Sequence, residues 1–336
     1  MRPTTMKAML CPVYGGPEVL TYKELPTPSP NASQVLVKVK AATVTAGDCE
    51  LRRFQITPLF WLPVRLYFGI LKPRKKMAIM GQEYAGEIVE IGSAVTGYKV
   101  GDAVFGLAGL GSGAYVEYRL HTNLKGMALK PAGVSFAAAA TIPTGGLNAV
   151  HFLRMAKIKP GDKVLINGAG GSIGTYGVQV AKHHGAEVTA VDSEEKLKML
   201  KTIGADHVID YRKLDYRDNG KQYDVIFDIV GQDWSSARLS SLKEGGRYVG
   251  ANPTFSMVIR SLWNRIKGSK KTVRTGLAGE TVEDFKTLTQ LYESGAIHAV
   301  VDREYELENL VEAHTYVDTG RKAGNVIINV DGANEK

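Results

Sequence analysis

Cysteine is scarce in this chain of 336 residues, which contains only Cys11 and Cys49. Two cysteines exclude a disulfide-stapled secreted scaffold, and no Cys-x-x-Cys pair is present to begin a zinc site. Long hydrophobic runs are also missing, since no stretch reaches the roughly 18 apolar residues of a membrane span. The N-terminal residues lack the apolar segment and cleavage site of a signal peptide. These absences predict a cytoplasmic protein with no transmembrane segment.

Disorder-type composition and low-complexity tracts are absent as well. Hydrophobic residues make up 44% of the chain and charged residues 23%, with a mean hydropathy of -0.11, as in ordinary globular proteins. The length exceeds the size at which a single core stops growing, so two domains are expected. The 42 basic residues outnumber the 34 acidic ones and give a net charge of +8. That surplus suits phosphate-rich ligands, nucleic acid and anionic surfaces equally.

Two basic clusters adjoin apolar sequence. Residues 60–71 form an apolar stretch that contains Pro63 and Arg65 and precedes basic residues at 72–76. A lid over an apolar pocket is the favoured interpretation, and peripheral membrane contact through 60–76 is the alternative. A second cluster, at 260–274, is interleaved with Trp263. Solvated loop charge explains that cluster better than nucleic-acid binding, because no nucleic-acid-binding motif accompanies it.

The pattern of apolar residues changes once along the chain. The first 125 residues or so contain short alternating segments separated by glycine and proline, which predict a β-rich domain. From about residue 135, apolar runs alternate with helical patterns, which predicts a doubly wound parallel sheet. The five expected strands are 163–169, 187–192, 207–211, 223–231 and 246–252. Elements after residue 275 resemble those of the first domain, so the chain is expected to return there.

A glycine-rich turn, Asn167 to Gly174, lies between a predicted strand and a predicted helix. A dinucleotide pyrophosphate needs a tight turn, close backbone approach and a helix N-terminus, and this context supplies all three. The first glycine of the usual G-x-G-x-x-G pattern is replaced by alanine. A glycine-rich turn without ligand is the structural alternative. The predicted cofactor-binding residues of the turn are Gly168, Ala169, Gly171, Ser172, Ile173 and Gly174.

Asp192 ends the second strand of this sheet, 18 residues beyond Gly174. A carboxylate there accepts hydrogen bonds from an adenosine ribose and repels a 2′-phosphate, which favours NAD over NADP. Helix capping is the alternative role for Asp192. Four residues lie where they could instead bind a 2′-phosphate. They are Ser193, Lys196, Tyr211 and Arg212, so NADP stays open.

The motifs together resemble the medium-chain dehydrogenase/reductase superfamily over essentially the whole chain, most closely its zinc-independent quinone oxidoreductase branch. They are VLVKVKAATVTAGD at 35–48, GQEYAGEIVEIGSAVTGYKVGDAVFG at 81–106, ATIPTGGLNAVHFL at 140–153 and KPGDKVLINGAGGSIGTYGVQVAK at 159–182. The resemblance implies an α/β fold with a GroES-like catalytic domain at 1–125 and a Rossmann NAD(P)-binding domain at 126–270. Residues 271–336 would complete the catalytic domain, and a homodimer is implied.

The resemblance also bears on zinc. The zinc-dependent members place a Cys, a His-Glu pair and a further Cys or acid at positions occupied here by Thr45, by Gln82 with Glu83, and by Ala140. Losing these nitrogen and sulfur ligands removes what zinc requires. No metal site is therefore expected.

The resemblance further implies site residues in both domains. Thr45 and Asp48 match an N-x-x-D loop, where a turn role is nearly as good an explanation, and Gln82 and Tyr84 are candidate contacts to the substrate oxygen. Thr144 matches a position beside the nicotinamide, although helix capping explains it equally well. The carboxyl ends of parallel strands bind ligands in open sheets, which adds Val230, Ala251 and Asn252 to the cofactor site.

These observations predict an NAD(P)H-dependent oxidoreductase that reduces a small apolar quinone or α,β-unsaturated carbonyl. Hydride addition to an electron-poor carbon needs no Lewis acid, whereas alcohol dehydrogenation loses its means of stabilising the alkoxide when zinc is missing. A zinc-free alcohol dehydrogenase or aldehyde reductase is one alternative. A catalytically lapsed dinucleotide-binding protein with a structural or nucleic-acid role is another, although no nucleic-acid partner is expected.

Overall fold

The computed structural model describes residues 2–109, 113–122, 124–231, 236–266, 268, 270–279 and 281–331. The chain forms two units. Unit 1 comprises Met1–Thr144, Glu280–Thr289 and Val301–Lys336, and unit 2 comprises Gly145–Gly279 and Gln290–Val300. This division assigns residues up to Thr144 to unit 1, whereas the sequence analysis begins the second domain at residue 126.

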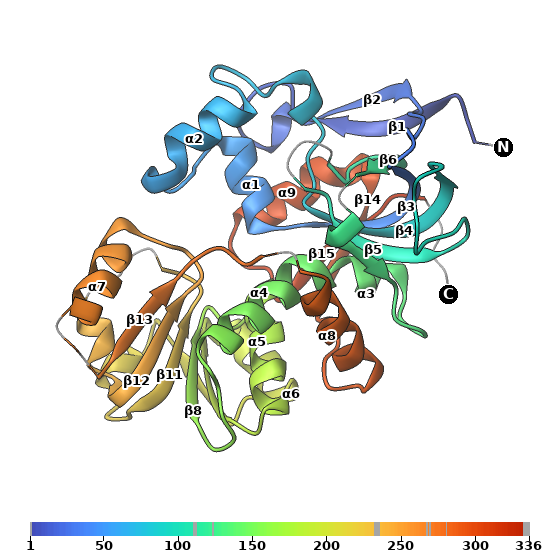
Figure 1. Cartoon of the computed structure of the whole chain (residues 1–336). Helices are drawn as coiled ribbons and strands as arrows, with labels where there is room; N and C mark the ends of the chain where they lie inside the picture. Colours follow the sequence, from blue (N-terminus) through green and yellow to red (C-terminus); the bar gives the residue numbers. More distant parts are fainter. Residues whose placement is uncertain are drawn as a thin grey trace. The chain divides into compact units, whose positions relative to one another are not determined.

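Unit 1 is built on a seven-stranded sheet in the order β14-β15-β3-β4-β5-β7, with β6 also paired to β3 (Figure 1). The C-terminal β15 pairs antiparallel with β3, where Val326 lies opposite Val44, so the predicted return of the chain is confirmed. A separate hairpin joins β1 and β2. The strands are β1 (Thr5–Leu10), β2 (Thr21–Pro26), β3 (Val35–Val44), β4 (Glu83–Ile91), β5 (Ala103–Leu107), β6 (Tyr118–His121), β7 (Met127–Leu129), β14 (Val301–Glu306) and β15 (Asn325–Asn329).

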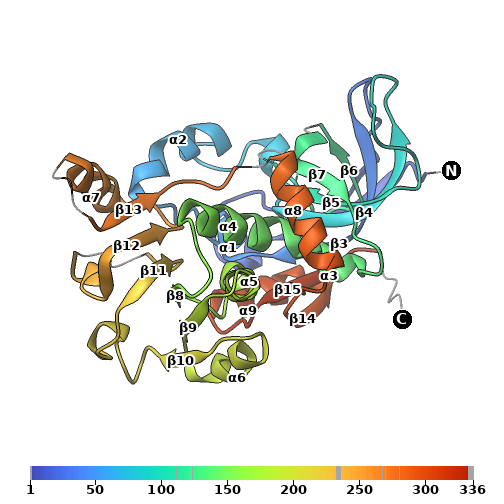
Figure 2. The ribbon, with the colours of Figure 1, turned by 60° about the horizontal axis from the view of Figure 1, so that its bottom comes forward.

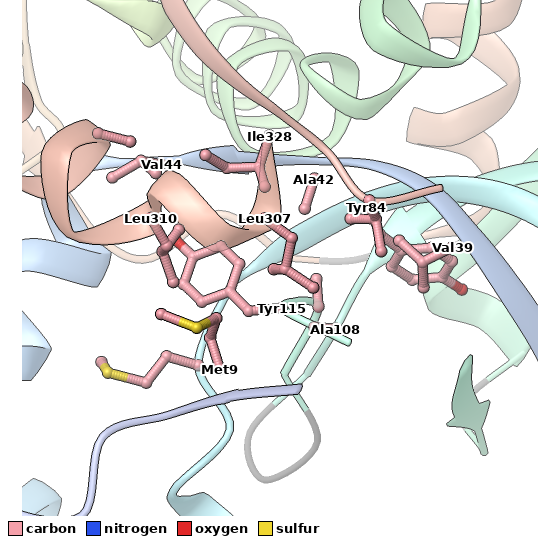
Figure 3. Close-up of a cluster of buried hydrophobic side chains, with 14 of the residues drawn as sticks. Met9, Val39, Ala42, Val44, Tyr84, Ala108, Tyr115, Leu307, Leu310 and Ile328 are labelled. Atoms are coloured by element: carbon pink, nitrogen blue, oxygen red, sulfur yellow. The ribbon is translucent and has the colours of Figure 1, made fainter. Parts of the chain in front are cut away.

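The core of unit 1 joins distant parts of the sequence. Val39 and Ala42 of β3 belong to one buried cluster with Tyr84 of β4 and with Leu307 and Ile328 from the C-terminal segment (Figure 3). Most residues of β3 are buried, as expected of a strand inside a sheet that is covered on both faces. The α-helices that begin in this unit are α1 (Ala46–Arg53), α2 (Pro58–Phe68), α3 (Phe136–Ala140), α4 (Ile142–Met155), α8 (Val282–Glu293) and α9 (Leu310–Asp318).

Unit 2 contains the predicted doubly wound sheet, which is confirmed as a parallel sheet in the order β10-β9-β8-β11-β12-β13. Figure 2 shows β10 with α6 at one end of this sheet and β13 with α7 at the other. Its strands are β8 (Lys163–Asn167), β9 (Glu187–Asp192), β10 (His207–Asp210), β11 (Tyr223–Asp228), β12 (Leu242–Gly250) and β13 (Thr272–Thr275), and its helices are α5 (Ser172–His183), α6 (Glu194–Thr202) and α7 (Phe255–Ile266).

Helix α7 and strand β13 were not predicted from the sequence, and the sheet has six strands where five were expected. The basic residues of 260–274 suggested a loop, but the apolar residues of α7 recur at helical spacing, and β13 is only four residues long. The helix predicted near 233–242 is partly outside the described residues. Its described part contains a 3-10 helix, Ser236–Leu239, followed by the start of β12 at Leu242.

Short 3-10 helices complete the described chain, at Pro17–Val19, Lys75–Met77, Leu124–Gly126, Tyr216–Asp218, Ser236–Leu239 and Leu307–Asn309. Across the described residues, no helix has both the length and the apolar character needed to cross a bilayer.

Candidate functional site

The glycine-rich turn connects β8 to α5. Gly168 has a φ of +83°, a left-handed conformation that glycine adopts without strain. The N–H groups of Gly168 and Ala169 donate to the carbonyl of Val191 on β9 at 3.0 and 3.1 Å, which ties the turn to the neighbouring strand. Gly171 is the N-cap of α5, and no side chain caps this helix end. The N-terminal turn of α5, where the helix dipole favours an anion, therefore begins directly at the glycine-rich turn.

Three glycines of the turn have different surroundings. A Cβ at Gly174 would lie 2.4 Å from the carbonyl oxygen of Gly168, so close approach of α5 to the turn requires glycine there. A Cβ at Gly170 would lie 2.4 Å from Cδ of Lys196. At Gly171, the nearest atom to such a Cβ is the Gly168 oxygen at 3.8 Å. Gly171 thus faces open space, where a phosphate group could approach the backbone.

Asp192 lies at the carboxyl end of β9 and is directed at this turn. Its Oδ2 accepts from the N–H of Gly170 at 2.7 Å, and its Oδ1 accepts from the N–H of Ser193 at 2.8 Å. The ammonium group of Lys196 lies 3.2 Å from Oδ1 in an ion pair whose side chains are about one-tenth exposed. The carboxylate is therefore already balanced by two amide donors and one cation. Ser193 is the N-cap residue of α6, without a side-chain cap.

A cavity of about 590 Å³ lies beside the turn. Asp192, Lys196 and Tyr211, together with Gly168 and Val230, are predicted site residues that line it. The sequence analysis missed the rest of the wall, to which two arginines contribute. The additional lining residues are Asn167, Val191, Asp215, Tyr216, Arg217 and Arg238.

Asp228 organises one side of this region, although it is fully buried. Parallel register places it opposite Asn167 of β8, whose side-chain amide donates to Oδ1 at 2.9 Å. Oδ2 accepts from the Tyr248 hydroxyl and lies 3.4 Å from Nη1 of Arg238. A signal for this residue was present in the sequence, since β9, β10 and β11 all end in aspartate.

The predicted residues after β11 and β12 lie near this network. The side chain of Val230 is partly exposed at the cavity, and Ala251 N–H donates to the Asp228 carbonyl at 2.9 Å. The Asn252 amide donates to the carbonyl of Ile229 at 2.7 Å, which ties the two strand ends together. Ser172 and Ile173 begin α5, beyond Gly171.

Thr45 and Asp48, in unit 1, form a capping box at the start of α1. The Thr45 hydroxyl donates to Oδ2 of Asp48 at 2.7 Å and accepts from the Asp48 N–H at 3.0 Å. Asp48 is fully buried, and burial raises the pKa of its carboxyl to about 6. The two residues therefore hydrogen-bond to each other as a capping box, which is a helix-capping geometry.

Gln82 and Tyr84 occupy different environments. Gln82 is half-buried, and its side-chain amide lies so close to Gly47 that a Cβ there would be 2.5 Å from Nε2. Tyr84 is fully buried, its hydroxyl lies 2.9 Å from Nδ1 of His121, and the Arg119 guanidinium lies 4.1 Å from its ring centre. Of the two, only Gln82 is partly exposed, and Tyr84 packs in the core of unit 1.

Glu83 joins β3, β4 and the start of α4. Its carboxylate accepts from the Thr43 hydroxyl at 2.5 Å and from the Thr144 N–H at 2.6 Å. Burial without a cation raises the pKa of Glu83 to about 7. Thr144 thus lies in the first turn of α4, where Glu83 satisfies one of the free helix amides. From the sequence, Glu83 was expected to belong to the lost zinc motif or to make a structural ion pair, and the contacts described for it are the hydrogen bonds to Thr43 and Thr144.

The side chains at the family's zinc positions do not fit zinc. Thr45 and Ala140 carry no metal-binding nitrogen or sulfur, and Glu83 is committed to two hydrogen bonds. Among the residues that the structure describes, no three His, Cys, Asp or Glu side chains gather into a metal-binding group.

Comparison with known proteins gives a consistent result. Residues 31–144 match the alcohol dehydrogenase GroES-like domain, and residues 203–328 match the zinc-binding dehydrogenase family. The chain is 32% identical to a 2-methylene-furan-3-one reductase of Solanum lycopersicum, over 97% of the chain and 79% of the relative. It is 32% identical to an NADPH-dependent alkenal/one oxidoreductase of Arabidopsis thaliana, over 97% of the chain and 80% of that protein.

Solved structures show the same relationship. The quinone oxidoreductase of Coxiella burnetii superimposes with a TM-score of 0.84 at 28% identity, over 97% of this chain and 99% of that one. Sequence and structure agree along nearly the whole length. The chain therefore belongs to the medium-chain dehydrogenase/reductase superfamily, in its quinone oxidoreductase-like branch.

Proposed function

We propose that the protein is an NAD(P)H-dependent oxidoreductase that reduces small apolar quinones or α,β-unsaturated carbonyls. The observation that carries the proposal is the glycine-rich turn beside the 590 Å³ cavity, at the carboxyl ends of β8 to β11. In an open parallel sheet, this edge is where dinucleotides bind. Three of the similar proteins are named a 2-methylene-furan-3-one reductase, an alkenal/one oxidoreductase and a quinone oxidoreductase, which supports the substrate class.

The reaction needs two electrons and two protons in total. A nicotinamide cofactor would supply one hydride to an electron-poor carbon of the substrate, and the developing enolate or quinol oxygen would take a proton from water or a protein group. The amides at the start of α5 would hold the pyrophosphate. Orientation and exclusion of water are then the protein's contributions to the rate.

We infer the cofactor preference from the ion pair and the hydrogen bonds of Asp192. The sequence alone favoured NAD, because a free carboxylate repels a 2′-phosphate. In the structure, that carboxylate is balanced by Lys196 and by the N–H groups of Gly170 and Ser193. Lys196 and the exposed Tyr211 line the same cavity, next to Arg217. We therefore propose that NADPH binds at least as tightly as NADH.

Substrate contact is proposed for Gln82, whose side-chain amide can donate a hydrogen bond to a carbonyl oxygen. Thr45 and Asp48 are proposed to hold the loop beside Gln82 through their capping box. Zinc-independence stays part of the proposal, and its support is the chemistry of the side chains at the zinc positions.

A homodimer and a cytoplasmic location are also proposed. The sheet of unit 2 ends at β13, and exposed strand edges readily pair with a second strand. Cys11 and Cys49 are free and buried, which suits a reducing compartment. Sedimentation velocity would test the dimer directly.

The activity is tested by following NADPH and NADH absorbance at 340 nm with 1,4-benzoquinone, an enone and a simple aldehyde, each with and without a metal chelator. Chelator-resistant oxidation driven by the quinone or the enone is expected. Oxidation with the aldehyde alone would favour a carbonyl reductase, and binding of neither cofactor would overturn the proposal.

A further inference from the structure

The surplus positive charge of the chain is concentrated in two stretches that contain no acidic residue. The stretches are residues 51–82 and 245–279, with seven basic residues each. The rest of the chain contains 28 basic and 34 acidic residues, a net charge of −6. One pyrophosphate site does not require such a distribution. Each stretch also includes an apolar helix followed by basic residues, α2 in the first and α7 in the second.

Helix α2 exposes large apolar side chains on one face while its other face packs on unit 1. Phe68 is buried against Phe54 and Met77 in a small apolar cluster. On the outer face, Leu62 is 58% exposed, and Leu71, just beyond the helix, is 88% exposed. Trp61, Leu66, Tyr67 and Ile70 are exposed too. This row exceeds the scattered apolar residues of an ordinary surface, and such patches mark interaction sites.

The only basic residue within α2 is held in place by aromatic rings. The Arg65 guanidinium carbon lies 4.4 Å from the ring centre of Tyr14, 4.2 Å from that of Phe54 and 5.8 Å from that of Trp61. These contacts fix the orientation of the helix. Four exposed cations follow the helix, at Lys72, Arg74, Lys75 and Lys76. Of these, Arg74 donates to the carbonyl of Leu66 at 2.8 Å.

Helix α7 repeats this composition in unit 2. Met257 on its inner face is fully buried in the core of the sheet, whereas Phe255, Ile259 and Leu262 are more than half exposed. Val258 and Trp263 add to the exposed face. Basic residues follow at Lys270, which is exposed and pairs with Glu244 at 2.7 Å, and at Lys271, whose ammonium group donates to the carbonyl of Leu239 at 2.8 Å. The side chain of Arg265 and the whole of Lys267 lie outside the described residues.

We propose that α2 and α7, with the basic residues that follow them, bind the surface of an anionic lipid bilayer. An interfacial helix needs an apolar face with Trp, Phe or Leu and adjacent cations, and both segments supply these groups. The acid-free sequence removes repulsion from anionic headgroups. The exposed aliphatic side chains favour lipid over nucleic acid, which binds cationic surfaces through phosphates and stacks its bases on aromatic rings. The inference does not depend on the proposed activity.

Co-sedimentation of the full chain with vesicles tests the proposal. Vesicles of phosphatidylcholine alone are compared with vesicles that contain one quarter phosphatidylglycerol, at low and at physiological salt. Binding to the anionic vesicles that weakens as salt rises is expected, with little binding to the neutral ones. Equal failure to bind both kinds of vesicle at low salt would overturn the proposal, whatever the enzyme assay shows.

Matched variants locate the contact. Lys75→Glu/Lys76→Glu is expected to weaken binding to anionic vesicles about tenfold or more, and Trp61→Ala/Leu62→Ala should have a comparable effect through lost apolar contact. The charge control is Lys125→Glu/Lys198→Glu, which changes two exposed lysines elsewhere by the same net charge and should have a much smaller effect. Equal losses of affinity in the two charge variants would mean that net charge alone drives binding. That result would overturn the proposal that α2 and the basic residues after it form the binding surface.

A second pair of substitutions tests helix α7 in the same vesicle-binding experiment. Leu262→Ala/Trp263→Ala removes the same two kinds of side chain as the α2 variant, and its vesicle affinity is expected to fall as well. Sedimentation velocity and thermal unfolding are measured for every variant, so that loss of fold or of assembly is seen separately. Altered oligomeric state with unchanged vesicle binding in both apolar variants would assign these faces to a second copy instead. Retention of a single-stranded oligonucleotide without vesicle binding would assign them to nucleic acid.

Discussion

The two units bury carboxylates in opposite ways. In unit 1, Asp48 and Glu83 are fully buried beside hydroxyl and amide groups, and burial raises the pKa of both. In unit 2, Asp192 and Asp228 lie beside the cations Lys196 and Arg238, and both cations line a cavity together with Asp192. The first pair organises the starts of helices. The second pair lies beside the proposed cofactor site, where a counter-charge adjoins each acid.

The largest effect is expected from a substitution in the glycine-rich turn of unit 2, beside Asp192. Gly174→Ala places a methyl group 2.4 Å from the Gly168 oxygen, so we expect a large loss of stability, of about 2–4 kcal/mol, from overpacking. Urea unfolding followed by circular dichroism measures it. An unchanged unfolding midpoint would show that α5 does not approach the turn as closely as described.

Gly171→Ala is the matched control, because its methyl group meets only one atom, at 3.8 Å. Its fold should be preserved, whereas its affinity for NADPH should fall at least about tenfold if the pyrophosphate occupies that space. Fluorescence titration with NADPH measures the dissociation constant. If a folded Gly171→Ala variant bound NADPH as tightly as the wild type, the pyrophosphate could not lie against Gly171.

Glu83 gives a pH-dependent prediction for unit 1. Burial raises its pKa to about 7, whereas the carboxyl titrates near 4.5 in the unfolded chain. The native state therefore holds this proton more tightly, and stability falls as pH rises from about 4.5 to about 7, by roughly 3 kcal/mol for this group. His314 acts in the opposite direction below pH 6.5, since burial lowers its pKa to about 3.

Comparison of wild type with Glu83→Gln isolates the Glu83 contribution, because His314 is common to both proteins. The difference in unfolding free energy between them should shift in favour of the variant as pH rises from 5 to 8. A constant difference across that range would show that Glu83 is ionised at all these pH values and that its burial is compensated.

Lys196→Ala tests the charge balance at Asp192. Without the ammonium group, the carboxylate repels a 2′-phosphate, so NADPH affinity should fall about tenfold or more while NADH affinity changes little. The readout is the ratio of the two dissociation constants. Equal losses for both cofactors would mean that Lys196 only supports the turn, next to Gly170.

The smallest effect is expected at Tyr84. Tyr84→Phe removes one hydrogen bond to His121 and should cost about 1 kcal/mol of stability with kcat unchanged. A large fall in kcat with unchanged stability would show that the Tyr84 hydroxyl takes part in the reaction.

The sequence predicted the sheets and the turn well for physical reasons. Period-two patterns and alternating βα segments reflect local burial, and glycine in a strand–turn–helix context reflects a backbone requirement, as at Gly168. The hydrogen-bond and packing partners of a buried side chain, in contrast, cannot be predicted from the neighbouring sequence. That Asp192 accepts a hydrogen bond from Gly170, that Glu83 bonds to Thr144, and that Tyr84 faces the core all depend on elements brought together by folding.

Helix α7 was missed for a related reason. Its basic residues dominated the interpretation of 260–274, although Met257 and the exposed apolar row share helical spacing. Asp228 could have been found, because it ends a strand as Asp192 does. Arg238 could not, since only the tertiary fold places it 3.4 Å from Asp228.

Transfer of a labelled hydride tests the proposed reaction most directly. The enzyme is supplied with NADPH deuterated at the transferable C4 position and with an enone, and the saturated product is analysed by mass spectrometry. We predict one deuterium at the carbon β to the carbonyl, in the presence of chelator as in its absence. Product without deuterium at that carbon, or label carried instead by the carbinol carbon of an alcohol, would contradict conjugate reduction at this site.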